Sequence, residues 1–172
     1  KGQIIAADIS SSRLNRIKPR IKRAGISVIS TAPFDASALV QAIDPVDRVL
    51  IDAPCSGTGT WRRHPEARWR LTPDQLKDYI KTQADLLHDG AKLVRSGGWV
   101  IYATCSLLKE ENEDQVTAFL NGHKGFTRVP VKEYLDDHQL ILTGLDSESN
   151  LSLSPARNNT DGVFVAVFEK HI

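Results

Sequence analysis

Residues 49–59 read VLIDAPCSGTG, and residues 99–106 read WVIYATCS. Each stretch is an apolar run of strand length that ends in a small or polar residue and then in Cys-Ser, where the chain must turn. The helix-length segment between them makes the two strands parallel neighbours. In open α/β sheets, ligands bind beyond the carboxyl ends of parallel strands. We therefore expect the chain's only two cysteines, Cys55 and Cys105, to lie at a functional site.

The same alternation of strands and helices runs along most of the chain. Strands are expected over residues 4–8, 26–30, 46–52, 99–103, 126–129, 139–143 and 163–169. Helices are expected over residues 13–24, 35–43, 72–94 and 110–121, with loops over 54–71 and 146–159. The third helix opens with a capping box, and the acids at the start of the fourth suit the positive end of its dipole. This order predicts a doubly wound α/β fold.

Length and composition restrict the class of protein. The chain has 172 residues, 41% of them hydrophobic and 25% charged, which is typical of one folded domain. No apolar run is long enough to cross a membrane. Two cysteines without a disulfide-like spacing indicate a reducing compartment, so we expect a cytoplasmic protein. The histidines and cysteines lack metal-ligand spacing, and no metal is expected.

Three motifs carry a resemblance to a known family. They are DAPCSGTG at 52–59, RRHPE at 62–66 and YATCS at 102–106, the last followed by EENE at 110–113. In this order they resemble the Sun/Fmu-type (RsmB-like) RNA cytosine-5 methyltransferases, from about Ile4 to Glu169. The resemblance implies a Rossmann-like fold that uses S-adenosylmethionine as cofactor. It also implies methyl transfer to carbon 5 of a cytosine in RNA, with ribosomal RNA as the expected partner.

The two cysteines fit the chemistry of that reaction. Carbon 5 of cytosine is a poor nucleophile until a thiolate adds to carbon 6. The resemblance makes Cys105 the attacking residue and Cys55 the second cysteine, which helps to release the product. DNA cytosine methyltransferases attack with the Pro-Cys position instead, so an exchange of roles is the alternative. A further alternative is that both are small buried apolar residues.

Three carboxylates are candidates for the cofactor. A carboxylate that ends a strand near a nucleotide loop accepts ribose hydroxyls, and Asp8 ends such a strand. By resemblance, Asp35 lies on the adenine side, and Asp52 lies between cofactor and target base, which also makes it a catalytic candidate. Asp35 could instead only cap the helix that follows it, and a capping role is open for Asp52 too.

The loop at 61–70 (WRRHPEARWR) contains four arginines, a histidine and two tryptophans against one acid. Arginine contacts phosphates and tryptophan stacks on unpaired bases. We therefore expect RNA contacts from a set of five side chains: Arg62, Arg63, His64, Arg68 and Trp69. For the basic helix at 13–23 two interpretations are equally open: it contacts RNA, or its charged face is only solvated.

The family has a further strand and a Gly-rich loop ahead of residue 4. We therefore expect residues 1–172 to form a single, N-terminally truncated catalytic domain that lacks both. Two sheet edges would then be covered by the missing N-terminal part of the chain or by another chain. On this hypothesis the fragment alone is inactive. A non-catalytic RNA-binding module and a small-molecule methyltransferase are the competing functions.

Overall fold

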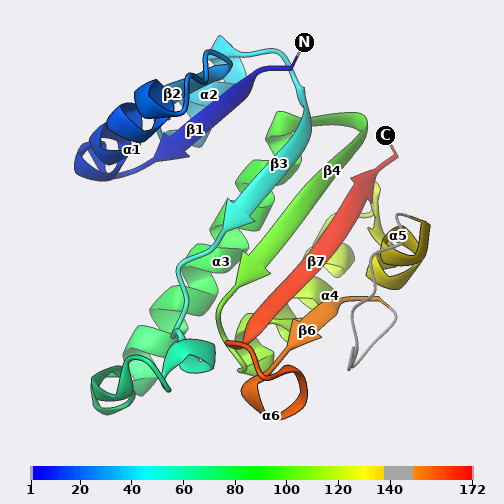
Figure 1. Ribbon diagram of the computed structural model, residues 1–172. Coiled ribbons are helices and arrows are strands. Elements are labelled where there is room, and N and C mark those ends of the chain that lie inside the picture. The colour runs from blue at the N-terminus through cyan, green and yellow to red at the C-terminus, as the bar shows by residue number, and fades with distance from the viewer. Residues whose placement is uncertain (1, 138–148, 172) are drawn as a thin grey trace. The chain divides into compact units, whose positions relative to one another are not determined.

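The computed structural model describes residues 2–137 and 149–171 (Figure 1). The chain divides into two compact units, Lys1–Asp44 and Pro45–Ile172, and each contains its own sheet. The strand predicted over residues 139–143 lies outside the described residues. None of the described helices has the length and apolarity needed to span a bilayer.

The first unit is a small β-α-β-α arrangement. Its elements are β1 (Ile4–Asp8), α1 (Ser11–Arg23), β2 (Ile29–Pro33) and α2 (Ala36–Ala42), and β1 pairs with β2 in parallel. Local capping chemistry starts both helices, and at Asp35 it is the alternative that the sequence left open beside a cofactor role. The hydroxyl of Ser10 accepts the backbone N–H of Arg13, and the carboxyl group of Asp35 accepts that of Ala38.

The second strand was predicted three residues too early, over residues 26–30. The backbone N–H of Ile26 still donates to the carbonyl of Ile21 at the end of α1, with Gly25 at φ +63° between them. The chain is therefore still closing the helix where the apolar pattern indicates a strand. Parallel pairing with β1 begins only at Ile29, which lies opposite Ile4.

The second unit contains the larger sheet, in the order β3-β4-β7-β5, with β6 beside β7. Its strands are β3 (Val46–Asp52), β4 (Val94–Thr104), β5 (Phe126–Val129), β6 (Leu151–Leu153) and β7 (Val163–Lys170). Its helices are α3 (Pro73–Leu93), α4 (Glu113–Gly122), α5 (Val131–Asp137) and α6 (Pro155–Asn158), with 3₁₀ turns η1 (Thr58–Thr60), η2 (Pro65–Trp69) and η3 (Lys109–Glu111). The β3–β4 pair is parallel, and β4, β5 and β6 each run antiparallel to β7.

The remaining differences from prediction lie where a neighbouring segment decides the structure. Strand β4 begins at Val94 instead of Trp99. Val94 already pairs with Val46 of β3, and the register shifts before Trp99 pairs with Arg48, so the residues between them, including Gly97-Gly98, lie within the strand as an irregularity. Two segments predicted as loops contain short elements. Residues 54–71 contain η1 and η2, and residues 146–159 contain β6 and α6. Helix α4 begins at Glu113, three residues later than predicted, because η3 precedes it.

Helices α3 and α4 cover one face of the larger sheet (Figure 1). On that face Val100, Tyr102 and Phe168 are fully buried, and a Cβ added to Gly90 of α3 would lie 2.9 Å from the side chain of Ile51. Glycine at this position therefore lets α3 pack closely on the Ile51 side chain of β3. These residues belong to the apolar core that holds both strand ends in place.

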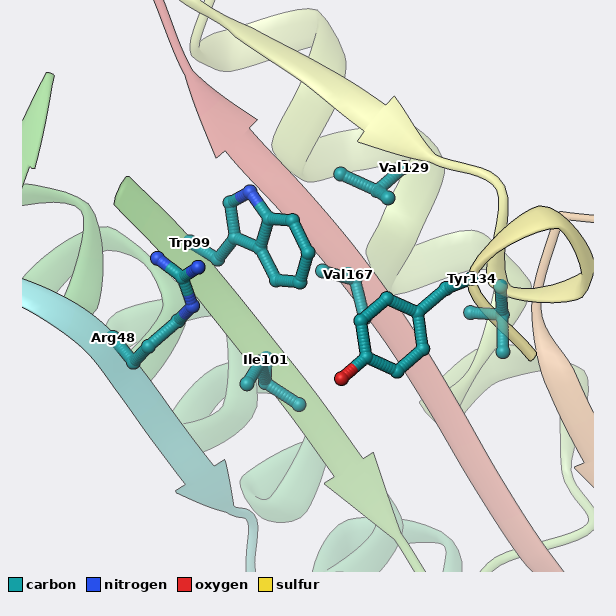
Figure 2. A pocket seen from close by; sticks show the side chains of 7 residues that line it. Arg48, Trp99, Ile101, Val129, Tyr134 and Val167 are labelled. Atoms are coloured by element: carbon teal, nitrogen blue, oxygen red, sulfur yellow. The ribbon is translucent and has the colours of Figure 1, made fainter. Parts of the chain in front are cut away.

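The opposite face of the sheet carries an apolar pocket of about 260 Å³ (Figure 2). The guanidinium carbon of Arg48 lies 4.2 Å from the ring centroid of Trp99, whose other neighbour is the edge-on ring of Tyr134 from α5. The other lining residues are apolar: Ile101, Val129, Val131 and Val167. Neither cysteine lines this pocket, so it is separate from the thiol site described below.

The capping box of α3 allows a test of whether the Thr72 side chain stabilises the start of this helix. Thr72 Oγ1 accepts the N–H of Gln75, and Gln75 Oε1 accepts the N–H of Thr72. Thr72→Ala should lower the free energy of unfolding by about 1 kcal/mol in urea titrations, because it leaves a helix N–H without its acceptor. Lys77→Ala, which removes an exposed ion pair with Asp74, should change it by less than about 0.5 kcal/mol. Equal effects would contradict the capping role.

Candidate active site

The two cysteines meet at the carboxyl edge of the larger sheet. Asp52 pairs with Ala103 in the parallel register, and the N–H of Ala53 donates to the carbonyl of Ala103 at 3.0 Å. Beyond this point the two chains turn toward each other, and the Sγ atoms of Cys55 and Cys105 lie 3.4 Å apart. Both thiols are half-buried.

The hydrogen bond between the thiols separates their acidities. It lowers the pKa of Cys105 to about 7, against opposing effects of burial and of the charges of Asp52 and Glu111. The pKa of Cys55 is raised, first by the same hydrogen bond and then by burial. As pH rises above about 7 the pair therefore comes to hold one proton, and the pKa directions favour Cys105 as the thiolate and Cys55 as the S–H donor.

Asp52 is the last residue of β3 and is exposed. Its charge raises the pKa of Cys105, so the carboxyl group acts on that sulfur. Within the described part of the chain no residue donates a hydrogen bond to its side chain. The Asp52 carboxylate is thus available to a ligand and is not used as a helix cap.

Glycines join the two cysteine loops to the start of β7. The N–H of Gly59 donates to the carbonyl of Cys105 at 2.9 Å, and the N–H of Gly162 donates to the carbonyl of Gly59 at 2.8 Å. A Cβ on Gly59 would lie 2.6 Å from the Cα of Gly162, so both positions require glycine. The segment that leads into β7 therefore packs directly against the cysteine turns.

Glu111 is a buried carboxyl group beside this site that the sequence motifs do not single out. Its side chain has no exposed surface and accepts the N–H of Ser56 at 2.9 Å, the hydroxyl of Ser56, and Nε2 of Gln83 at 3.0 Å. The sequence pattern explains the acids after YATCS by the helix dipole, whereas Glu111 lies in η3 and is fully buried. Two features of the sequence could have indicated a buried carboxyl group here: the acidic run after the third motif, and Gln83 on the otherwise apolar face of α3.

The Arg-rich loop is partly neutralised by Asp161, whose pairing with the loop the sequence did not indicate. Arg62 Nε lies 2.8 Å and Arg63 Nη2 lies 2.6 Å from the two carboxyl oxygens of Asp161. Hydrogen bonding to Arg63, and the charges of both arginines, hold the pKa of Asp161 below its usual range. These two arginines therefore also tie the loop to the segment before β7.

The second half of the loop is more open. Trp69 is 81% exposed, and the guanidinium carbon of Arg68 lies 5.3 Å from the centroid of its ring. His64 lies 3.7 Å from Glu66 and is exposed. An exposed tryptophan with an arginine beside it offers a stacking surface and a positive charge together. Trp61, in contrast, is half-buried, with its indole N–H inside the protein.

The two other cofactor candidates lie in the first unit, at the carboxyl end of the β1–β2 pair. Asp8 receives two hydrogen bonds of 2.8 Å from Arg13 and one of 2.7 Å from the N–H of Ser10, and Arg13 foremost lowers its pKa. Asp35 caps α2 through Oδ1. Carboxylates at strand ends fit the hydroxyl and amino groups of a nucleoside. In the described residues no cluster of three or more His, Cys, Asp or Glu could bind a metal.

Comparison with known proteins first defines the class. The fold is that of the Rossmann-like, S-adenosylmethionine-dependent methyltransferases. The crystal structure of NSun6 from Pyrococcus horikoshii with SFG matches with a TM-score of 0.81 and 29% identity, over 99% of this chain and 42% of that one.

The family then follows from the sequence comparisons. The model of the 16S rRNA methyltransferase RsmB/F family matches residues 1–169, and the chain belongs to this family. It is 34% identical to the probable ribosomal RNA small subunit methyltransferase B of Synechocystis and 33% identical to the ribosomal RNA small subunit methyltransferase B of Citrobacter koseri. It covers 38% and 36% of the length of these two relatives, which in turn match 99% and 96% of this chain.

The thiol pair predicts a pH dependence. Cys105 becomes reactive toward iodoacetamide as pH rises through its pKa of about 7, since the thiolate is the nucleophile. Cys55→Ala removes the S–H donor, so the midpoint should move up toward about 8.5, the value of a free cysteine. Cys55→Ser keeps a donor and should retain most of the shift. The readout is the alkylation rate of the Cys105 peptide; an unchanged midpoint in Cys55→Ala would contradict the donor role.

Proposed function

We propose that the whole protein transfers a methyl group from S-adenosylmethionine to carbon 5 of a cytosine in small-subunit ribosomal RNA, through a covalent bond between Cys105 and the base. The observation that carries the proposal is the pair of sulfur atoms 3.4 Å apart, of which Cys105 is the more acidic. Membership of the RsmB/F family supports the RNA substrate.

The reaction follows from the acidities of the two thiols. The Cys105 thiolate adds to carbon 6, which makes carbon 5 nucleophilic enough to take the methyl group that S-adenosylmethionine supplies. Once Cys105 is bound to the base, its negative charge is gone, and with it the hydrogen bond and charge that raise the pKa of Cys55. Cys55 can then lose its own proton to water, and its thiolate takes the carbon 5 proton while the double bond re-forms and Cys105 leaves as a thiolate.

The carboxylates divide between cofactor and base. Asp8 and Asp35 would hold the ribose and adenine of the cofactor, respectively, as their positions at strand ends suit. Asp52, exposed and beside Cys105, would orient the target ring and the methyl donor. The free cysteines suit a reducing, cytoplasmic environment.

The RNA strand would be bound by the Arg-rich loop. A cytosine in a helix must be unstacked before carbon 6 can reach a sulfur, and an exposed aromatic ring stabilises unstacked bases. Trp69 and Arg68 offer that surface, with His64 nearby in the same loop. Arg62 and Arg63 retain more than half of their side-chain exposure beside Asp161 and can still contact phosphates.

Product analysis tests the reaction. The whole protein is incubated with labelled S-adenosylmethionine and unmodified small-subunit ribosomal RNA, and the RNA is digested to nucleosides for mass spectrometry. The label should appear as 5-methylcytidine, and Cys105→Ala should lower its rate at least about a thousandfold. Label in another nucleoside would refute the cytosine-5 proposal. RNA binding without any transfer would favour a non-catalytic RNA-binding module.

RNA affinity tests the loop. Trp69→Ala should weaken binding of single-stranded RNA by about 1–3 kcal/mol, since it removes a stacking ring. Arg68→Ala should reduce the magnitude of the slope of log affinity against log salt concentration by about 1, which corresponds to the loss of one phosphate contact. Arg95→Ala is the matched control, because Arg95 is also exposed but pairs with Asp47, at the opposite end of the β3–β4 pair from the thiols. Equal losses in all three would contradict a specific role for the loop.

A further inference from the structure

We infer that Glu111 is a positioning residue that, together with its neighbour Asn112, fixes the distance between the two reacting thiols. The inference rests on the proposed function, since it assigns both thiols to one reaction. Its basis is that two adjacent side chains hold the residues on both sides of each cysteine.

Glu111 holds the turn that contains Cys55. Its Oε1 accepts the N–H of Ser56 at 2.9 Å, and its Oε2 accepts the Ser56 hydroxyl. On the other side of Cys55, the carbonyl of Pro54 accepts Nε2 of Gln83 at 2.9 Å, and the same nitrogen donates to Glu111 at 3.0 Å. Backbone groups before and after Cys55 are therefore bound, directly or through Gln83, to one carboxyl group.

The orientation of Gln83 shows what this arrangement requires. Its side chain is fully buried, and its Oε1 has no hydrogen-bond partner among the described residues. Turning the amide over would place that oxygen against the carbonyl of Pro54 and the carboxyl group of Glu111, which are both acceptors. The buried amide thus leaves its acceptor unsatisfied while its nitrogen serves the Cys55 turn.

Asn112 holds the turn that contains Cys105. Its Oδ1 accepts the hydroxyl of Thr104 at 2.7 Å, and its Nδ2 donates to the carbonyl of Ser106 at 2.9 Å. The segment itself is anchored to β4, because the hydroxyl of Tyr102 donates to the carbonyl of Glu111 at 2.7 Å. Glu111, the last residue of η3, and Asn112, its C-cap, thus fix both cysteine turns relative to β4.

A purely electrostatic role would work against the reaction. The groups that act on Cys105 are Cys55, which stabilises the thiolate by hydrogen bonding, and the charges of Asp52 and Glu111, which disfavour it. A negative charge beside the nucleophile hinders its ionisation, so charge alone gives no reason for a carboxyl group at this place. Its contacts to the Cys55 turn supply that reason, because they keep the Cys55 donor against Cys105.

Glu111→Gln separates these two effects in the whole protein, because it removes the charge and replaces one of the two acceptor oxygens with a donor. If Glu111 positions Cys55, the alkylation midpoint of Cys105 with iodoacetamide should move up by about one pH unit, as the Cys55 donor is lost. If Glu111 were only a nearby charge, the midpoint would move down. Glu110→Gln, an exposed carboxyl group on the same turn, is the matched control and should leave the midpoint unchanged.

Kinetics give a second readout. In the methyl-transfer assay, kcat of Glu111→Gln should fall about 10–100-fold with the KM for RNA nearly unchanged, because the reacting groups are misplaced while the RNA surface is intact. Should Glu111→Gln fail to fold, Gln83→Met removes only the second link to the Cys55 turn and should raise the alkylation midpoint as well. A midpoint that falls or stays in the folded variants would overturn the inference. Absence of methyl transfer in the wild type would refute the proposed function alone, since the alkylation measurement needs neither RNA nor cofactor.

Discussion

The parallel pairing of β3 with β4 is the constraint on which the site depends. Its register puts Asp52 beside Ala103, so both strands end at the same level and each continues into a turn that contains a cysteine. Helices α3 and α4 bury one face of this pair around Val100 and Tyr102, which fixes the strand ends. A 3.4 Å separation of two sulfur atoms is thus a consequence of the sheet, refined by hydrogen bonds in the turns.

The elements that could be predicted from the sequence are those with local causes. Thr72 begins its helix as predicted, and Asp35 caps its helix as one of the two roles left open, because an N-cap needs only the following turn. The position of β2 and the existence of β6 depend on partners elsewhere in the chain. Ile26 and Val28 give residues 26–28 the pattern of a strand, yet pairing with β1 starts at Ile29. Three residues at 151–153 are extended because β7 lies beside them.

The same division holds for the site. The two Cys-Ser motifs and the carboxylate that ends β3 could be identified from the sequence, because strand ends are where chemistry collects. Glu111, Gln83 and Asp161 could not be identified, because their roles exist only in three dimensions. An acid near a helix start has a sufficient local explanation in the helix dipole, and only the fold shows that Glu111 points inward to Ser56. Asp161 lies ninety-nine residues from Arg62, the arginine it pairs with.

The account therefore depends on which sulfur reacts with the base. The most direct measurement incubates the whole protein with S-adenosylmethionine and small-subunit ribosomal RNA carrying 5-fluorocytidine. Fluorine at carbon 5 cannot be removed as a proton, so the covalent intermediate is trapped. Digestion and mass spectrometry then identify the residue that carries the nucleotide. The account predicts the adduct on Cys105, and its persistence in Cys55→Ala. An adduct on Cys55 would contradict it and exchange the roles of the two cysteines.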